Sequence, residues 1–386
     1  MSDLNFLPGN GINVLAFGAD ASGMTDSLAA FERAVHAAHE KRLPVFIPTG
    51  LYILESTLFL PSDTAVFAER TARIKLGGAC RKARGDFLLS NADTAHGNKN
   101  ISVSGGVWDG NNTAEANAKP DLFDKNGYSG AVLNFSGVEN LTLSDLVIAN
   151  SVTYNIRMTR IENFVIENID FVSDTFGQNQ DGLHFGGEVR HGRVKNIRAL
   201  SHGQTNDDLI ALNADDSVER VENLDLVRGT IEDIVFEDLF AEDCHTILRF
   251  LSVTAPIRNI TIRNVYGGYR CYAINLDGAR YCRTPLFAEQ EYPDGIGKIE
   301  NVLIENMTCR ETGTARCPAI CLETGTKNFR LKNFRLVRSE SLAPALAAKN
   351  LVRTRIEADG DARVLKNKDE HAEIRNFRDL AVDTDI

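Results

Sequence analysis

Three aspartates, Asp181, Asp207 and Asp208, have the residue type and spacing for acid and base chemistry. Neighbouring carboxylates repel each other, and this repulsion raises the pKa of at least one of them. Hydrolysis of a glycosidic bond uses such groups, since one carboxylic acid protonates the leaving oxygen while another carboxylate activates water or attacks directly. Aspartates at strand starts also serve as turn residues or calcium ligands, so that alternative stays open. A second pair, Asp215 and Asp216, lies beyond the strand and is predicted to be solvated.

The elements that must position these aspartates belong to a repeat. An eight-residue pattern begins at residues 98, 138, 161, 189, 231, 257, 299 and 326, as in IENFVIEN and IENVLIEN. Its third and eighth places favour Asn or Asp, which we interpret as structural columns of stacked turns. Its fourth and sixth places are mostly apolar and alternate with polar residues, which is the period of a β-strand with one buried face. Intervals of 23–28 residues fit one coil of a solenoid, and intervals of 40–42 fit a coil with an inserted loop or a second, weaker coil.

This repeat predicts an all-β chain that folds as a right-handed parallel β-helix in one structural domain. Residues 1–60 are predicted to form an N-terminal cap and first coil, with a short helix that begins at Thr25 or Ser27 and ends near residue 41. Residues 61–356 are predicted to form the β-helix. Residues 357–386 are charged, lack the pattern and are predicted to cap the other end, because an exposed apolar cross-section would aggregate.

A second strand follows most copies of the pattern, and aligning these strands groups the candidate binding residues. The aligned segments are YNIRMT (154–159), DGLHFG (181–186), DLIALN (208–213), TILRFL (246–251), YAINLD (272–277) and AICLE (319–323). Asp181 and Asp208 both occupy the first place, one coil apart. The third and fifth places are apolar in the first five segments and point inward, so the fourth place points outward. At a strand spacing of ~4.8 Å, that outward column predicts a polar groove long enough for several sugar units.

Substrate-binding roles are predicted for residues in or beside this column. Its arginines and histidine can bind hydroxyl groups or an acidic substituent, and tyrosine rings can stack against sugar faces. His245 lies just before its strand, where it can donate a hydrogen bond to a carboxylate or a sugar hydroxyl. The predicted binding residues are Tyr154, Arg157, Asn179, His184, Asn213, His245, Arg249, Tyr272, Asn275 and Asp277.

Composition excludes several classes of partner. The net charge of −11 would repel nucleic acid, and no apolar run is long enough to suggest a membrane partner. The seven cysteines lack the spacing of metal ligands, which predicts reduced, mostly buried thiols and neither a metal nor a cofactor. The first residues lack the charged and apolar regions of a secretory signal, which predicts a cytoplasmic location, or an extracellular one if a leader has been removed.

Several segments together resemble the pectin-lyase-like superfamily of single-stranded β-helices, and within it the polygalacturonase-type glycoside hydrolase family 28. The opening module is similar to VLAFGADASGMTDSLAAFERAV followed by VFIPTGLYIL, and the G-x-x-D-G-N coil to GGVWDGNN (105–112). The N-T-D-G motif resembles residues 179–182, NQDG. The D-D-C-I-A-I-N motif closely resembles residues 207–213, DDLIALN.

This resemblance implies an inverting hydrolase in which Asp181 and Asp208 are candidates to activate water and Asp207 protonates the leaving oxygen. Two motifs depart from the family. G-H-G appears as residues 244–246, CHT, and R-I-K, which grips the uronate carboxylate, falls on residues 275–277, NLD. The loss of both basic residues predicts that polygalacturonate is a poor substrate and favours a neutral or differently charged glycan.

Three functions remain open from the sequence. The first is a glycoside hydrolase that cleaves an oligosaccharide or polysaccharide. The second is a polysaccharide lyase, in which Arg157 or Arg249 would be the base and the aspartates would be metal ligands. The third is a non-catalytic glycan-binding β-helix of the phage tail-fibre or adhesin type. A homo-oligomer, such as a trimer, is a further expectation because trimers are frequent among such β-helices.

Overall fold

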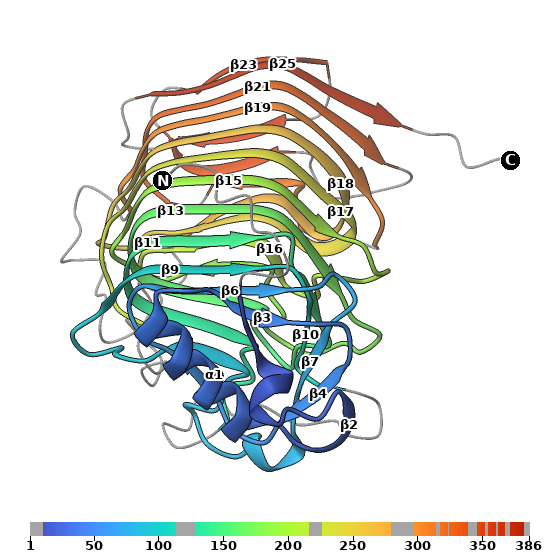
Figure 1. The fold of residues 1–386 in the computed structure, drawn as a ribbon. Coiled ribbons are helices and arrows are strands. Elements are labelled where there is room, and N and C mark those ends of the chain that lie inside the picture. The colour runs from blue at the N-terminus through green and yellow to red at the C-terminus, as the bar shows by residue number, and fades with distance from the viewer. Residues whose placement is uncertain are drawn as a thin grey trace, which may run out of the picture.

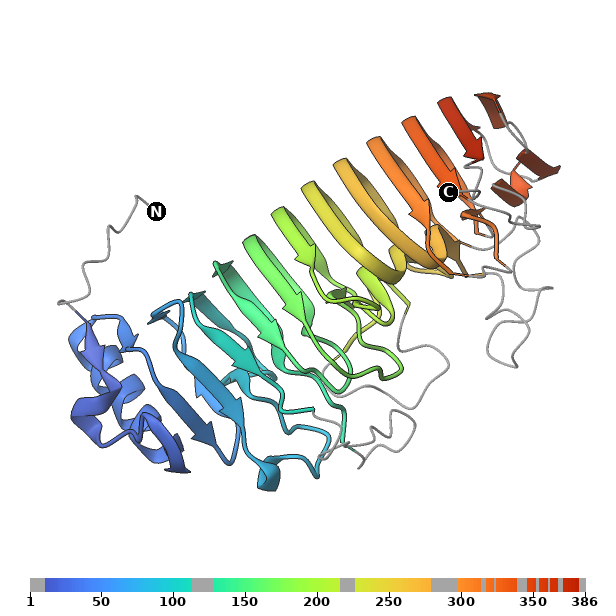
Figure 2. The same cartoon turned by 90° about the vertical axis from the view of Figure 1, so that its right-hand side faces the viewer.

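The repeated pattern forms the strands of a right-handed parallel β-helix, as predicted. The computed structural model describes residues 11–112, 128–215, 226–278, 297–313, 317–322 and 324–338, together with four strands beyond residue 345. The strands pair in parallel with those of neighbouring coils, and the coils stack along one axis from the N-terminal to the C-terminal end (Figures 1 and 2). No helix among the described residues is both long and apolar enough to cross a membrane.

The strands fall into three groups along the axis. The first coils contain β1 (Ile12–Asn13), β2 (Ser22–Asp26), β3 (Val45–Ile47), β4 (Leu51–Leu54), β5 (Leu58–Leu60), β6 (Thr64–Ala68), β7 (Arg73–Leu76), β8 (Leu89–Asn91), β9 (Asn98–Ser104) and β10 (Val107–Asp109). The middle coils contain β11 (Leu133–Ser144), β12 (Val147–Ala149), β13 (Ile156–Val172), β14 (Leu183–Phe185), β15 (Val189–Ala199), β16 (Asp208–Asn213), β17 (Ile231–Leu251) and β18 (Ile257–Asp277). The last coils contain β19 (Ile299–Glu311), β20 (Ile320–Leu322), β21 (Thr326–Arg338), β22 (Leu346–Leu351), β23 (Thr354–Asp359), β24 (Ala362–Lys366) and β25 (His371–Ala381).

The alternation in the pattern produces the core. In β13, Phe164 and Ile166 occupy the fourth and sixth places and are buried, whereas Val165 between them is exposed. Successive coils repeat this arrangement, so each coil covers the apolar face of the one before.

The Asn and Asp places form ladders at the bends, as expected. Asn168 has a φ of 57°, a left-handed conformation that Asn tolerates better than most residues. Its side-chain amide donates to Asp145 of the preceding coil at 3.0 Å and accepts from Asn196 of the following coil at 2.8 Å. These ladders satisfy the polar groups of each bend and hold consecutive coils in register.

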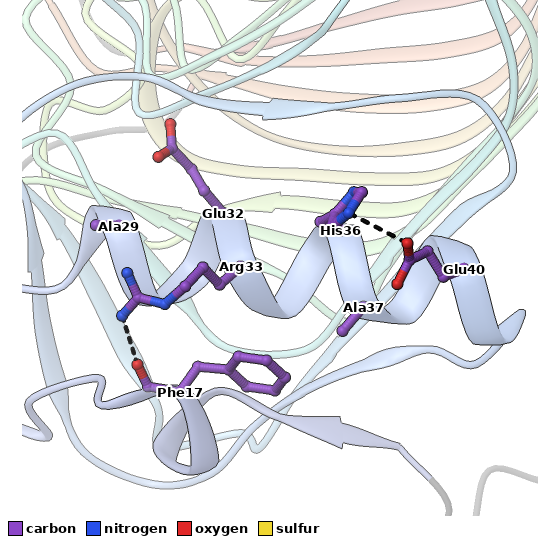
Figure 3. Close-up of a pocket in the computed structure, with 7 residues that line it drawn as sticks. All are labelled: Phe17, Ala29, Glu32, Arg33, His36, Ala37 and Glu40. Atoms are coloured by element: carbon purple, nitrogen blue, oxygen red, sulfur yellow. Dashed lines mark hydrogen bonds and ion pairs between the residues drawn. The ribbon is translucent and has the colours of Figure 1, made fainter.

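The helix α1 (Leu28–Lys41) covers the N-terminal end of the core, as predicted (Figure 1). Its apolar face buries Phe31, Ala34 and Val35 against the first coils. Ser27 is the N-cap residue, but its hydroxyl accepts from the backbone of Asp20 and makes no cap hydrogen bond to the helix. A shallow hollow lies between α1 and the 3-10 turn η1 (Val14–Phe17), on the outer side of the helix (Figure 3).

Strands continue past the predicted start of the C-terminal cap. The boundary at residue 357 falls inside β23, and β25 pairs in parallel with both β21 and β23. The described residues of this segment, in β23, β24 and β25, therefore belong to further coils, in which the eight-residue pattern is incomplete.

Candidate functional site

The structure confirms the register in which the second strands were aligned from the sequence. Arg157 lies opposite His184, His184 opposite Ala211, Ala211 opposite Arg249, and Arg249 opposite Asn275. Period-two alternation and coil stacking therefore suffice to bring residues from five coils into one column.

The three predicted catalytic aspartates meet where two of these strands begin. Asp208 is the first residue of β16, and the amide of Gly182, next to Asp181, donates to its carbonyl at 2.8 Å. A side chain at position 182 would approach the carbonyl oxygen of Leu209 to 2.5 Å, so the coils stack this closely only with glycine there. Asp207 precedes Asp208, and its carbonyl accepts from the amide of Thr246 in the next coil.

The three carboxylates differ in exposure. The side chain of Asp207 is 23% exposed, whereas those of Asp181 and Asp208 are 3% and 2% exposed. Asp207 is therefore the most accessible of the three carboxylates, and the other two are closed off from bulk solvent.

Asp181 is held by a buried histidine. Its Oδ2 lies 2.5 Å from Nδ1 of His184, and the ring of Tyr154 packs at 4.3 Å from the imidazole. Oδ1 has no hydrogen-bond partner among the described residues. Burial, together with the charge of Asp207, raises the pKa of Asp181 to about 6, against the opposing effects of His184 and Arg249.

Asp208 shares an arginine with another buried carboxylate. Arg249 places Nη1 at 3.5 Å from Oδ2 of Asp208 and Nη2 at 3.4 Å from Oδ2 of Asp277. Asn275 donates to Asp277 at 3.3 Å. Burial and the neighbouring charge of Asp207 raise the pKa of Asp208 well above its usual value, although Arg249 acts in the opposite direction.

His245 stands at the accessible edge of the site. Its side chain is 41% exposed, with Nδ1 at 3.6 Å from Oδ1 of Asp207 and 3.1 Å from the hydroxyl of Thr246. Burial of the ring lowers the pKa of His245, and the charge of Asp207 opposes this effect. Ligand atoms of Asp207, Asp208 and His245 lie within 4.8 Å of one another, which is close enough to hold a metal ion, the alternative that the sequence leaves open for these aspartates.

The expectation of an open polar groove along the column is wrong. Loops outside the sheet cover the outward side chains, and Arg157 lies beneath the ring of Phe87 at 5.1 Å while it donates to Asn134. Phe87, Ala131 and Tyr154 form an apolar cluster separate from the solenoid core. The predicted binding residues that are at most 4% exposed are Tyr154, Arg157, His184, Asn213, Asn275 and Asp277. They support the site from behind, whereas Asn179, His245, Arg249 and Tyr272 retain some exposure.

Two side chains have roles that the sequence did not suggest. Arg270 is 24% exposed and donates to Asn206 and to the carbonyl of Asp243, and its charge contributes to the lowered pKa of His245. Asp215 is buried instead of solvated, because its carboxylate accepts from the amides of residues 253, 254 and 255 at 2.6–2.8 Å. Asp216 lies outside the described residues.

Comparison with known families identifies the family of this chain. A family model described as "Rhamnogalacturonase A/epimerase, pectate lyase-like" matches residues 11–273, more than half of the chain. The chain belongs to this rhamnogalacturonase A/epimerase family. The predicted place among pectin-lyase-like β-helices is confirmed.

The proteins and solved structures to which this chain is similar have names that point to different functions. An exopolygalacturonase of Arabidopsis thaliana is 25% identical over 314 residues, which cover 78% of this chain and 62% of that protein. The preneck appendage protein of Bacillus phage PZA is 36% identical over 104 residues, which cover 26% of this chain and 12% of the phage protein. The family 28 exopolygalacturonase of Yersinia enterocolitica has a similar fold, with a TM-score of 0.56 and 16% identity over 96% of this chain and 78% of that one. The chain thus spans less than two thirds of the length of both curated relatives.

Proposed function

We propose that this chain is a glycoside hydrolase that cleaves a glycosidic bond of an oligosaccharide or polysaccharide with Asp181, Asp207 and Asp208. The observation that carries the proposal is the convergence of these carboxylates at the starts of two neighbouring strands, beside the exposed His245. Membership of a pectate lyase-like family and similarity to exopolygalacturonases support the same class of reaction.

The roles follow from exposure and from electrostatics. Asp207 is the general acid, because it alone of the three reaches the accessible edge where the leaving oxygen would lie. Asp181 is the better base of the two buried candidates, since its pKa is raised only to about 6 and its Oδ1 is uncommitted. Water bound at this oxygen would attack from the side opposite to Asp207, with inversion at the anomeric carbon.

His184 and Arg249 are positioning residues in this mechanism. His184 holds Oδ2 of Asp181 at 2.5 Å, which leaves Oδ1 to face a water molecule. Arg249 lies between Asp208 and Asp277 and offsets part of the repulsion among the buried carboxylates. His245 and Tyr272 are the side chains that we assign to contact with the glycan.

Polygalacturonate is not the preferred substrate in this proposal. Residues 275–277 provide Asn, Leu and Asp, and all three side chains are buried. The described cations nearest the accessible edge, Arg249 and Arg270, are already held by carboxylate or carbonyl groups. A neutral glycan, or one whose acidic group lies elsewhere along the chain, fits these residues better.

A screen of plant, bacterial and storage glycans for released reducing ends tests the proposal. Wild type should release reducing sugar from at least one glycan, and Asp207→Asn should not. The control is Asp145→Asn, which changes an exposed ladder aspartate and keeps an acceptor oxygen for Asn168. If Asp207→Asn and wild type are equally active on a verified substrate, the aspartate cluster is not the catalytic centre.

A polysaccharide lyase is the second candidate, favoured by the possible metal ligands Asp207, Asp208 and His245. Arg249 would then be the base, because Arg157 is fully buried. A lyase would produce an unsaturated sugar that absorbs in the near ultraviolet, and a chelator would abolish the reaction. A hydrolase would give neither result.

A non-catalytic glycan-binding β-helix is the third candidate, supported by the similarity to the phage appendage protein. In that case a glycan would bind and no product would form. Asp207→Asn would then change affinity alone.

A further inference from the structure

Two cysteines in neighbouring coils lie with their sulfur atoms almost in contact. Cys271 lies in β18 and Cys317 lies just before β20, and their Sγ atoms are 3.1 Å apart. Each lies three residues before the paired residues Ile274 and Ile320, so they occupy equivalent places in the two coils. Neither is fully buried, in contrast to Cys80, Cys244, Cys309 and Cys321.

This geometry is close to that of a disulfide. Adjacent strands lie ~4.8 Å apart, which falls within the Cα separations of about 4.4–6.8 Å that disulfides accept. A disulfide has a sulfur to sulfur distance of about 2.05 Å, so the two atoms need to approach by only about 1 Å. Rotation of the two side chains can supply that movement without a change of strand register.

We propose that Cys271 and Cys317 form a thiol–disulfide modification site that closes by exchange with a low-molecular-weight disulfide such as glutathione disulfide. The thiolate of one cysteine attacks the external disulfide, which releases one glutathione and leaves a mixed disulfide. The thiolate of the other cysteine then displaces the second glutathione. Two protein thiols are oxidised, one external disulfide is reduced to two thiols, and the two protons leave with the glutathione.

The bond would join the coil that carries Tyr272 to the following coil. Tyr272 is in register with Thr246, and Thr246 is in register with Asp208. Burial and a hydrogen bond with Cys317 raise the pKa of Tyr272, so the thiol pair already contacts a residue of the candidate site. The cross-link would therefore clamp one end of that site, whichever of the three functions the site performs.

The test uses the full chain, reduced and then incubated with glutathione disulfide in native buffer. A Cys282→Ser background is used because Cys282 lies outside the described residues. Wild-type positions 271 and 317 should lose both thiols, with a mass decrease of two hydrogen atoms and one peptide that links Cys271 to Cys317. Cross-linking residues 46 apart should raise the melting temperature by about 2–5 °C, and dithiothreitol should reverse the change.

Single variants decide whether the pair acts together. Cys271→Ser should leave Cys317 as a stable mixed disulfide with glutathione, and Cys317→Ser should do the same for Cys271. The matched control is Cys321→Ser, a buried thiol four residues from Cys317, which should still form the bond. The proposal is overturned if no peptide links 271 to 317, or if either single variant still loses two thiols without added glutathione mass.

Discussion

Aspartates lie in two contrasting settings along this solenoid. In the ladders, Asp145 and Asp238 each accept a hydrogen bond from the asparagine of a neighbouring coil, and their side chains are open to solvent. In the candidate site, Asp181 and Asp208 are buried, and the charge of Asp207 raises the pKa of both. The ladders use carboxylates as acceptors for asparagine amides, whereas the site concentrates like charges at a cost in stability. Such a concentration is typical of catalytic centres, where pKa values must be shifted.

The largest expected contrast is between the same substitution in the two settings. Asp207→Asn should slow turnover of glycans with poor leaving groups by at least about 100-fold, because it removes the general acid. Activated aryl glycosides should lose less, since their leaving group needs little protonation. Asp145→Asn should leave both rates within about twofold of wild type. Initial rates on the two substrate kinds measure the effect, and equal losses on both would remove the acid role from Asp207.

Asp208→Asn should separate activity from stability. If Asp208, the second base candidate, shares in activating water with Asp181, turnover should fall by about 100-fold on both substrate kinds alike, because water activation is needed whatever group departs. The free energy of unfolding at pH 8 should stay unchanged or rise by about 1 kcal/mol, since the ionised form is unfavourable in this buried place. Urea unfolding followed by circular dichroism gives the second value. A stability loss of several kcal/mol would mean that the ion pair with Arg249 outweighs the repulsion.

The raised pKa of Asp181 predicts a pH dependence of stability. Its pKa is about 6 in the folded chain against an ordinary value of 3.8, so the folded state binds the proton more tightly. The corresponding stabilisation is complete below about pH 3.8 and is lost as the pH rises through about 6, by up to ~3 kcal/mol. The difference in unfolding free energy between wild type and Asp181→Asn, measured from pH 4 to pH 8, should therefore change in favour of the variant. A constant difference would contradict the buried, charge-crowded environment.

The smallest effect concerns substrate choice. Polygalacturonate should be turned over about tenfold more slowly than the best neutral glycan, because Asn275 and Asp277 offer its carboxylate no cation. Reducing-end release on both polymers measures the ratio. Efficient turnover of polygalacturonate would mean that Arg249 or Arg270 leaves its present partner to bind the uronate. If Arg270 is the residue responsible, Arg270→Gln would then abolish the turnover of polygalacturonate.

The sequence predicts the strands and their register because both depend on local periodicity. The alternation of apolar and polar residues places Phe164 and Ile166 in the core. Aligning the strands by the same alternation places Asp181 and Asp208 at equivalent positions of neighbouring coils. The exposure of the column depends on distant loops instead. Phe87, from the segment before β8, lies over Arg157, and no pattern within the strands encodes that contact.

Irregular backbone explains why Arg270 was missed. The pairing of β17 with β18 shifts register between Ala241 and Cys244 and again between Cys244 and Thr246. A β-bulge changes the face of the sheet to which the following residues point. The alternation of inward and outward residues therefore cannot be extended across these bulges to predict the side to which Arg270 points. The C-terminal strands depart from the pattern in a different way. β23 lacks the Asn and Asp places, whereas β25 keeps the eighth-place Asn, as Asn376, but its register with β21 shifts between Lys327 and Phe329, where the third place would lie.

Coil stacking also limits the positions along the axis at which mutations can place a side chain in the column. Neighbouring positions of the column, such as 249 and 275, belong to different coils and are separated along the axis by one strand spacing, ~4.8 Å. A point mutation can therefore transfer a charge along the axis only in whole steps of that size. Fine adjustment of specificity has to come from side-chain length or from the loops, and a longer recognition site requires the duplication of an entire coil.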